Sequence, residues 1–201
     1  MTIVVDHEQR RTVILERAFA LFAEEGYGGV TYQKIADRSG ISRTAIYKYF
    51  QNKEEIFMYA IMLATGNLNT MVEKVLDRKE WDALEKIERI LHITVRMLAE
   101  NRVFLTVVLD YILTQKQTGR DVKRKVRRHT IGMKYLLAKL LREADAAGEL
   151  VVRDAETAAS HLYGILEAYV LNLTVTEILD AKDCLHLIDR YLDGMKNGAA
   201  R

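Results

Sequence analysis

The sequence predicts an all-α fold, and three observations support this prediction. The chain of 201 residues contains no proline, the residue that breaks helix interiors. Apolar residues recur three and four positions apart along most of the chain, as in helices that bury one face. No segment shows the alternation of apolar and polar residues that is typical of a half-buried strand. A chain of this length can form one large domain or two small ones.

The N-terminal region contains one helix followed by signals for three more. Ile14, Ala18 and Phe22 define the apolar face of the first helix, and the glycines within residues 26–29 are expected to end it. Thr31, Ser42 and Asn52 are each suited to cap the N-terminus of a following helix, because their side-chain oxygens can accept a hydrogen bond from a free backbone N–H. Gly40 separates the second helix from the third. Two short helices joined by a glycine turn predict a helix-turn-helix.

The third helix is expected to have an apolar inner face and a positively charged outer face. Ile46 and Phe50 lie four residues apart and should point inward. The side chains on the opposite face are then Arg43, Thr44, Tyr47 and Lys48. No acidic residue occurs between Asp37 and Glu54. This is the face that a recognition helix presents to the major groove of DNA.

The predicted DNA contacts fall into two groups. Arg43 has the donors to bind a guanine edge, and Thr44 can offer a methyl or a hydroxyl group to a base. Tyr47, Lys48 and Tyr49 suit phosphates, which take more of the contacts than bases do. The full set of candidate DNA-binding residues is Thr31, Tyr32, Lys34, Ser42, Arg43, Thr44, Tyr47, Lys48, Tyr49 and Lys53. The alternative is a helical hairpin whose charged face is merely solvated.

Residues 31–55, TYQKIADRSGISRTAIYKYFQNKEE, resemble the DNA-binding signature of the tetracycline-repressor (TetR) family. The preceding helix, ILERAFALFAEEGYGGVT, is similar as well. The resemblance implies a homodimeric regulator, in most members a repressor, which releases double-stranded operator DNA when a small molecule binds its C-terminal domain. Lys34 departs from the family pattern, in which an acidic or neutral residue is more usual, and it would add a phosphate contact.

The chain is expected to divide into a DNA-binding domain, residues 1–55, and an effector-binding and dimerisation domain, residues 56–201. Helices of the second domain are expected at residues 56–76, 81–99, 102–117, 120–147, 155–179 and 181–195. The helix at 102–117 is apolar nearly all round and should be central. The last two helices combine small and large apolar residues and are expected to form a dimer seam, because one recognition helix reads too few bases to be selective. The alternative is that both are core helices of a monomer.

Polar residues within the apolar helices predict an effector cavity, since a ligand site places a few polar groups in an apolar wall. The candidates are His92, Arg96, Tyr111, His161, Tyr163 and Asn172. The effector is expected to be small and hydrophobic or similar to an acyl-coenzyme A. The basic run at 119–130, GRDVKRKVRRHT, reads as a solvated surface, and the alternative is an anion site for the phosphates of such an effector.

Other classes of protein find little support in the sequence. There is no glycine-rich phosphate loop, HExxH or GxSxG motif, and the five histidines show no paired metal-ligand spacing. We therefore expect no enzyme activity, cofactor or metal. The single Cys184 and the short apolar run at 103–109 favour a cytoplasmic protein that makes no membrane contact. The alternative to a DNA-binding regulator is a helical dimeric scaffold or protein-binding module that does not read DNA specifically.

Overall fold

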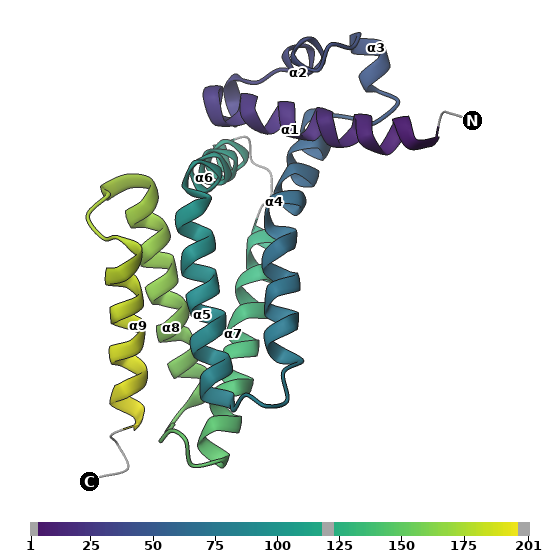
Figure 1. Cartoon of the computed structure of the whole chain (residues 1–201). Coiled ribbons are helices and arrows are strands. Elements are labelled where there is room, and N and C mark those ends of the chain that lie inside the picture. Colours follow the sequence, from purple (N-terminus) through teal and green to yellow (C-terminus); the bar gives the residue numbers. More distant parts are fainter. Residues whose placement is uncertain (1–3, 118–122, 197–201) are drawn as a thin grey trace. The chain divides into compact units, whose positions relative to one another are not determined.

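The computed structural model describes residues 4–117 and 123–196, and within these ranges every regular element is a helix (Figure 1). The elements are α1 (Val4–Gly29), α2 (Tyr32–Arg38), α3 (Arg43–Ile46), α4 (Lys53–Leu76), α5 (Ala83–Glu100), α6 (Arg102–Gln117), α7 (Lys123–Ala146), α8 (Ala155–Leu171), the π-helical turn η1 (Asn172–Thr176) and α9 (Ala181–Lys196). The all-α prediction is confirmed. No helix in the described part of the chain is long and apolar enough to span a membrane.

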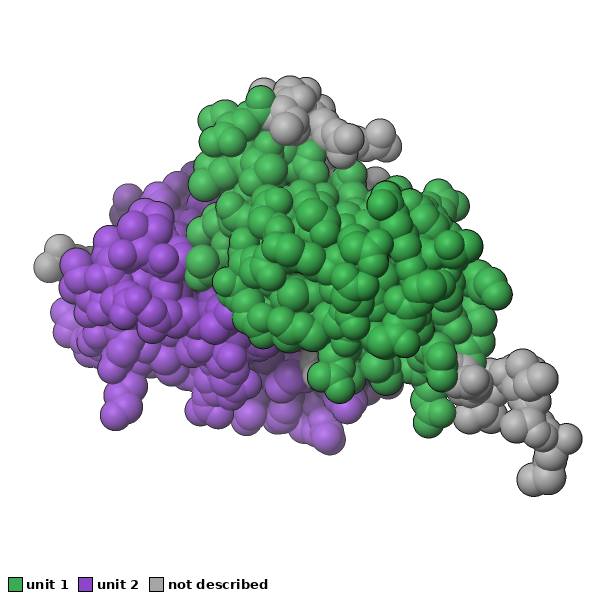
Figure 2. Space-filling view, turned by 90° about the horizontal axis from the view of Figure 1, so that it is seen from above, with its two compact units in different colours: residues 1–67, 106–120 green, residues 68–105, 121–201 purple. Residues whose placement is uncertain are grey.

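The chain forms two compact units, which Figure 2 shows in different colours. Unit 1 comprises residues 1–67 and 106–120, and unit 2 comprises residues 68–105 and 121–201. The division therefore falls within α4, and most of α6 belongs with the N-terminal helices. The domain boundary between residues 55 and 56 stays a prediction.

The predicted helix caps of unit 1 are confirmed. The Thr31 hydroxyl accepts a hydrogen bond of 3.2 Å from the Lys34 N–H, which fixes the start of α2. The Ser42 hydroxyl accepts one of 3.0 Å from Ala45 N–H at the start of α3. Asn52 Oδ1 accepts one of 2.9 Å from Glu55 N–H in the first turn of α4. These local bonds satisfy amides that have no partner within their own helix.

The glycines after the first helix have a different effect from the one expected. Helix α1 continues to Gly29 but is kinked at Gly26, whose φ of 69° and ψ of 168° are not helical. Glycine tolerates this positive φ because it has no Cβ. The glycine cluster therefore bends the helix, and the chain leaves it only after Gly29.

The prediction that residues 102–117 form a central helix is correct in its bounds and wrong in its placement. One face of α6 is buried in unit 1, and Val107, Tyr111 and Gln115 on that face are each 4% exposed. The other face is open, since Val103 and Leu113 are 56% and 58% exposed. A helix that is apolar on nearly all sides still buries only the face that its neighbours cover. The apolar pattern alone therefore did not determine where this helix lies.

Helices α5, α7, α8 and α9 build the core of unit 2. Fully buried residues of this core include Ile87 and Leu91 of α5, Leu137 of α7, Leu162 of α8 and Ile188 of α9. The helical spacing of the apolar residues in α5 correctly predicted its buried face. Helix α7 is described from Lys123, and the predicted start at Arg120 lies outside the described part of the chain, which omits residues 118–122.

Helix α8 ends earlier than predicted. It was expected to reach Leu179, but it stops at Leu171 and passes into η1, after which Glu177 adopts a left-handed φ of 54°. Threonine hydroxyls bond within this turn: Thr174 Oγ1 donates to the Val170 carbonyl at 2.8 Å, and Thr176 Oγ1 donates to Asn172 Oδ1 at 2.7 Å. Such side-chain bonds compete with a regular helix.

Candidate DNA-binding site

The short helix α3 presents the four residues that were predicted for its outer face. Arg43, Thr44, Tyr47 and Lys48 are all exposed. On the inner side Ile46 is fully buried and Phe50 nearly so. Tight turns extend the helix past its last residue, because the N–H groups of Tyr49 and Phe50 both donate to the Ile46 carbonyl, at 3.0 and 3.1 Å.

The connection between α2 and α3 has the geometry of a helix-turn-helix (Figure 1). Gly40 adopts a φ of 68°, which lets the chain reverse after α2. The Ile41 N–H then donates to the Ala36 carbonyl at 3.1 Å. Ile35 and Ala36 are completely buried and pack α2 against its neighbours. The turn thus holds α3 in a fixed orientation with its polar face in solvent.

Tyr32 supports the outer face of α3. Its hydroxyl donates to the Phe50 carbonyl at 2.6 Å, and its ring lies 4.8 Å from that of Tyr47. Burial of the hydroxyl raises the pKa of Tyr32 to about 12, so that it remains a neutral donor. Its contacts are with the recognition element itself, and they fix the position of Tyr47.

Two lysines of the predicted DNA-binding set contact the C-terminal end of α1 and the residue that follows it. Lys34 Nζ forms an ion pair with Glu25 and donates to the Gly29 carbonyl at 3.1 Å. Lys53 Nζ donates to the carbonyls of Tyr27 and Val30, both at 2.7 Å. Desolvation lowers the pKa of Lys53, which is part-buried in this position.

Fewer cations are therefore available on the outer face than the sequence suggested. Arg38 makes two hydrogen bonds to the Glu24 carboxylate, at 2.7 and 3.2 Å. Arg43 and Lys48 are exposed and pair with no acidic side chain among the described residues. These two cations, together with Thr44 and Tyr47, define the surface that we call the reader face.

Tyr49 has a neighbour that the sequence did not predict. It is half-buried, and its ring lies 4.6 Å from the imidazole of His7 in α1. His7 is absent from the predicted set because no local pattern connects it to residues 42 positions further along the chain. Only the packing of α1 against the turn after α3 brings the two rings together.

The six predicted effector-binding residues do not converge on one cavity. Tyr111 is buried in unit 1, where its hydroxyl donates to Glu54 Oε1 at 2.9 Å. His92 Nε2 lies 3.0 Å from Asp189 Oδ1, which joins α5 to α9, and Arg96 is exposed. Tyr163 Oη lies 3.1 Å from Thr130 Oγ1. Asn172 Nδ2 donates to the Ala168 carbonyl at 3.1 Å, within its own turn.

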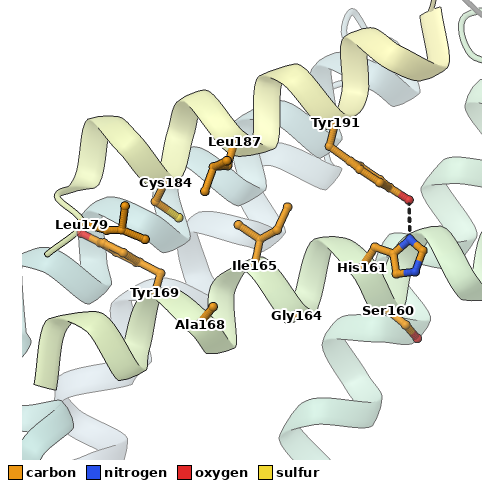
Figure 3. Close-up of a pocket in the computed structure, with 10 residues that line it drawn as sticks. All are labelled: Ser160, His161, Gly164, Ile165, Ala168, Tyr169, Leu179, Cys184, Leu187 and Tyr191. Carbon is orange, nitrogen blue, oxygen red and sulfur yellow. Dashed lines mark hydrogen bonds between the residues drawn. The ribbon is translucent and has the colours of Figure 1, made fainter. Parts of the chain in front are cut away.

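Of the six, His161 lines the pocket that lies between α8 and α9 in unit 2 (Figure 3). The pocket has a volume of about 420 Å³. Its lining residues are Ser160, His161, Gly164, Ile165, Ala168, Tyr169, Leu179, Cys184, Leu187 and Tyr191. His161 Nδ1 lies 2.9 Å from the Tyr191 hydroxyl. These two groups form a polar pair at one end of an otherwise apolar groove. In the basic run at 119–130, residues 119–122 and the side chains of 123–129 lie outside the described part of the chain.

An all-helical chain with a helix-turn-helix and an exposed reader face has the architecture of DNA-binding regulators. The family model for bacterial regulatory proteins of the tetR family matches residues 14–60. The model for the C-terminal domain of AefR-like transcriptional repressors matches residues 112–191. The chain is a member of the tetR family and a DNA-binding transcriptional regulator.

Relatives extend this similarity over most of the chain. The HTH-type transcriptional regulator PksA of Bacillus subtilis is 26% identical, over 89% of this chain and 85% of that protein. The fatty acid metabolism regulator protein of Bacillus subtilis is 26% identical, over 78% of this chain and 79% of that protein. The crystal structure of the repressor MexZ from Pseudomonas aeruginosa superimposes with a TM-score of 0.74 at 23% identity, covering 94% of this chain and 96% of MexZ. This last likeness shows the fold.

Proposed function

We propose that this regulator is a homodimeric repressor that leaves its operator when a small, largely apolar molecule binds the C-terminal region. The observation that supports coupling between ligand and DNA is the packing of α6 in unit 1. Helix α6 follows α5 in the chain, yet its buried face contacts α1 and α4, the helices that precede and follow the helix-turn-helix in the chain. A ligand that moves α6 therefore acts on the DNA-binding elements.

Three α6 side chains make these contacts, and all three contact Tyr27. Asp110 Oδ2 accepts a hydrogen bond of 2.6 Å from the Tyr27 N–H. Gln115 Nε2 donates to the Tyr27 hydroxyl at 3.5 Å. The Tyr111 ring lies 4.7 Å from the Tyr27 ring, and its hydroxyl bonds to Glu54 of α4. Because Lys53 also bonds the Tyr27 carbonyl, Tyr27 is held from α6 and α4 together.

The groove between α8 and α9 supports the proposed homodimer. Leu187 of α9 lines this groove and is 47% exposed. Gly164 and Ala168 of α8 lie beside it and leave room for a close helix approach. A second copy of the chain would cover this apolar surface, and two copies would double the number of base contacts.

One relative supports an acyl compound as the chemical class of the proposed effector. One of them is a fatty acid metabolism regulator, and an acyl chain agrees with an effector that binds among apolar helices. The six polar residues predicted to contact the effector stay a prediction. A long-chain acyl-coenzyme A and the corresponding free fatty acid are the two probes to test first.

Calorimetry with and without DNA tests the proposal. Each probe is titrated into the protein alone and into the protein saturated with an operator duplex obtained by binding-site selection. Because coupling between two ligands is reciprocal, saturating operator should weaken effector binding by a factor of about 5 to 150. Equal affinities in the two titrations would show that the coupling is absent. Binding of neither probe would exclude the acyl class.

The salt dependence of duplex binding tests the alternative that the protein is a scaffold that does not read DNA. DNA binding that neutralises several phosphates weakens steeply as salt rises. A scaffold that does not read DNA would show neither tight duplex binding nor a sequence preference at low salt.

A further inference from the structure

The first turns of α1 lie beside the end of the reader face. The His7 and Tyr49 rings have centroids 4.6 Å apart and planes inclined by 32°. Tyr49 directly follows Lys48, so the imidazole lies at the margin of the surface that faces DNA. The His7 side chain is exposed, and its ring nitrogens make no hydrogen bond to any residue that the structure describes.

A second basic residue of α1 contacts the same region. Arg11 lies one helical turn after His7, and residues four apart share a helix face. Its guanidinium carbon lies 4.2 Å from the centroid of the Tyr59 ring and 5.3 Å from that of Phe50. These contacts anchor α1 to the turn after α3 and to α4. The position of His7 next to Tyr49 is thus held by a packed neighbour.

We propose that His7, in its protonated form, donates a hydrogen bond to a DNA phosphate beside Tyr49, so that DNA binding is linked to uptake of a proton. The inference rests on the DNA-binding function of the reader face and adds α1 to it. Imidazole is the side chain whose charge normally changes between about pH 5 and pH 8. A phosphate within hydrogen-bonding distance favours the charged imidazolium, which then has a donor at both ring nitrogens.

The charges around His7 are mixed in the absence of DNA. Its own helix contributes the acidic neighbours Asp6 and Glu8 in sequence and the basic residues Arg10 and Arg11. The turn after α3 contributes Lys48 and Tyr49, and α4 contributes Tyr59 through its contact with Arg11. The largest electrostatic change on DNA binding is then the approach of phosphates, which acts in favour of protonation.

The test is the affinity for a duplex at roughly pH 6 and pH 8, measured by fluorescence anisotropy over a series of salt concentrations. Wild-type protein should bind several-fold tighter at the lower pH. The slope of log affinity against log salt should also be steeper there by roughly 0.9 per subunit, the value for one additional neutralised phosphate. His7→Gln should bind with the same slope at both pH values. His7→Lys, which stays charged, should keep the steeper slope at both.

The matched control is His186→Gln on α9, which also removes an exposed histidine and should behave like wild type. Equal pH dependence in wild type and His7→Gln would overturn the proposal. So would a His7→Gln variant that loses affinity equally at both pH values, since His7 would then only position Tyr49. Absence of duplex binding by wild type at low salt would instead contradict the DNA-binding function itself.

Discussion

The backbone N–H of Tyr27 donates a hydrogen bond of 2.6 Å to the carboxylate of Asp110, which lies 83 residues further along the chain. The bond forms at the kink of α1, immediately after Gly26. It joins α6 to the helix that leads into the helix-turn-helix. The proposed coupling between effector and DNA depends on this region. Substitutions at the kink test how much the region contributes to the stability of the protein.

Gly26→Ala should destabilise the protein. A Cβ at this position would lie 3.0 Å from Asp110 Oδ2, and the φ of +69° is strained for any residue with a side chain. The expected loss is about 1–3 kcal/mol in the free energy of unfolding, measured by urea denaturation. Gly28→Ala is the control, because its Cβ would meet nothing within 4 Å. Equal stabilities of the two variants would show that the kink does not constrain the fold.

Ser42 is expected to have separable effects on stability and on DNA binding. Ser42→Ala removes the cap of α3 and should cost about 1 kcal/mol. Ser42→Asp restores a capping oxygen but places a negative charge beside the reader face, so it should be nearly as stable as wild type and bind DNA more weakly. Denaturation and duplex titration of both variants provide the comparison. A Ser42→Asp protein as unstable as Ser42→Ala would contradict the capping role.

Leu187→Glu should convert the proposed dimer into a monomer, because it places a charge in the apolar groove between α8 and α9. Light scattering should then give the chain mass of 23.1 kDa, and wild type should give twice that value. Ile131→Glu on α7 is the control, since Ile131 is also about half exposed, at 53%, and lies outside the groove. A Leu187→Glu protein that remains dimeric would place the seam elsewhere.

Cys184 should be unreactive in the native protein. Burial raises the pKa of its thiol to about 11, from an ordinary value of 9.0, so the reactive thiolate is scarce at neutral pH. Alkylation by iodoacetamide should be at least roughly tenfold slower in the native state than in denaturant. An equal rate in both states would contradict burial of the thiol.

The same shift predicts how stability depends on pH. Above about pH 9 the unfolded chain releases the thiol proton while the folded chain retains it, so the folded state loses relative stability up to about pH 11. Cys184→Ala should lack this contribution. Denaturation curves of wild type and variant across this range should diverge; parallel curves would exclude a raised pKa.

The parts of the fold that depend on neighbouring residues were predictable from the sequence. The caps at Thr31 and Ser42 and the inward positions of Ile46 and Phe50 follow from bonds and spacings of three or four residues. These local features also placed Arg43, Thr44, Tyr47 and Lys48 on one exposed face. Their assignment as DNA contacts stays a prediction.

The sequence could not show contacts between residues that are distant in the chain. The Lys53 ammonium contacts carbonyls 26 and 23 residues earlier, so its charge is directed toward α1. Tyr111 bonds to Glu54, which makes it part of unit 1. The sequence pattern identified α6 as an apolar helix, but it did not show which of its faces is covered by other helices. The same limit applies to His7, whose contact with Tyr49 joins two separate helices.

Selection of duplexes from a random-sequence library tests the central claim most directly, with wild type, Arg43→Ala and Lys48→Ala compared in parallel. Wild type should recover a near-palindrome with half-site centres about one helical turn, or a multiple of it, apart. Arg43→Ala should lose about 1–3 kcal/mol and relax the base preference at one position in each half-site, whereas Lys48→Ala should weaken binding about equally for all sequences. Recovery by Arg43→Ala of the wild-type preference at every position would contradict the assignment of the reader face.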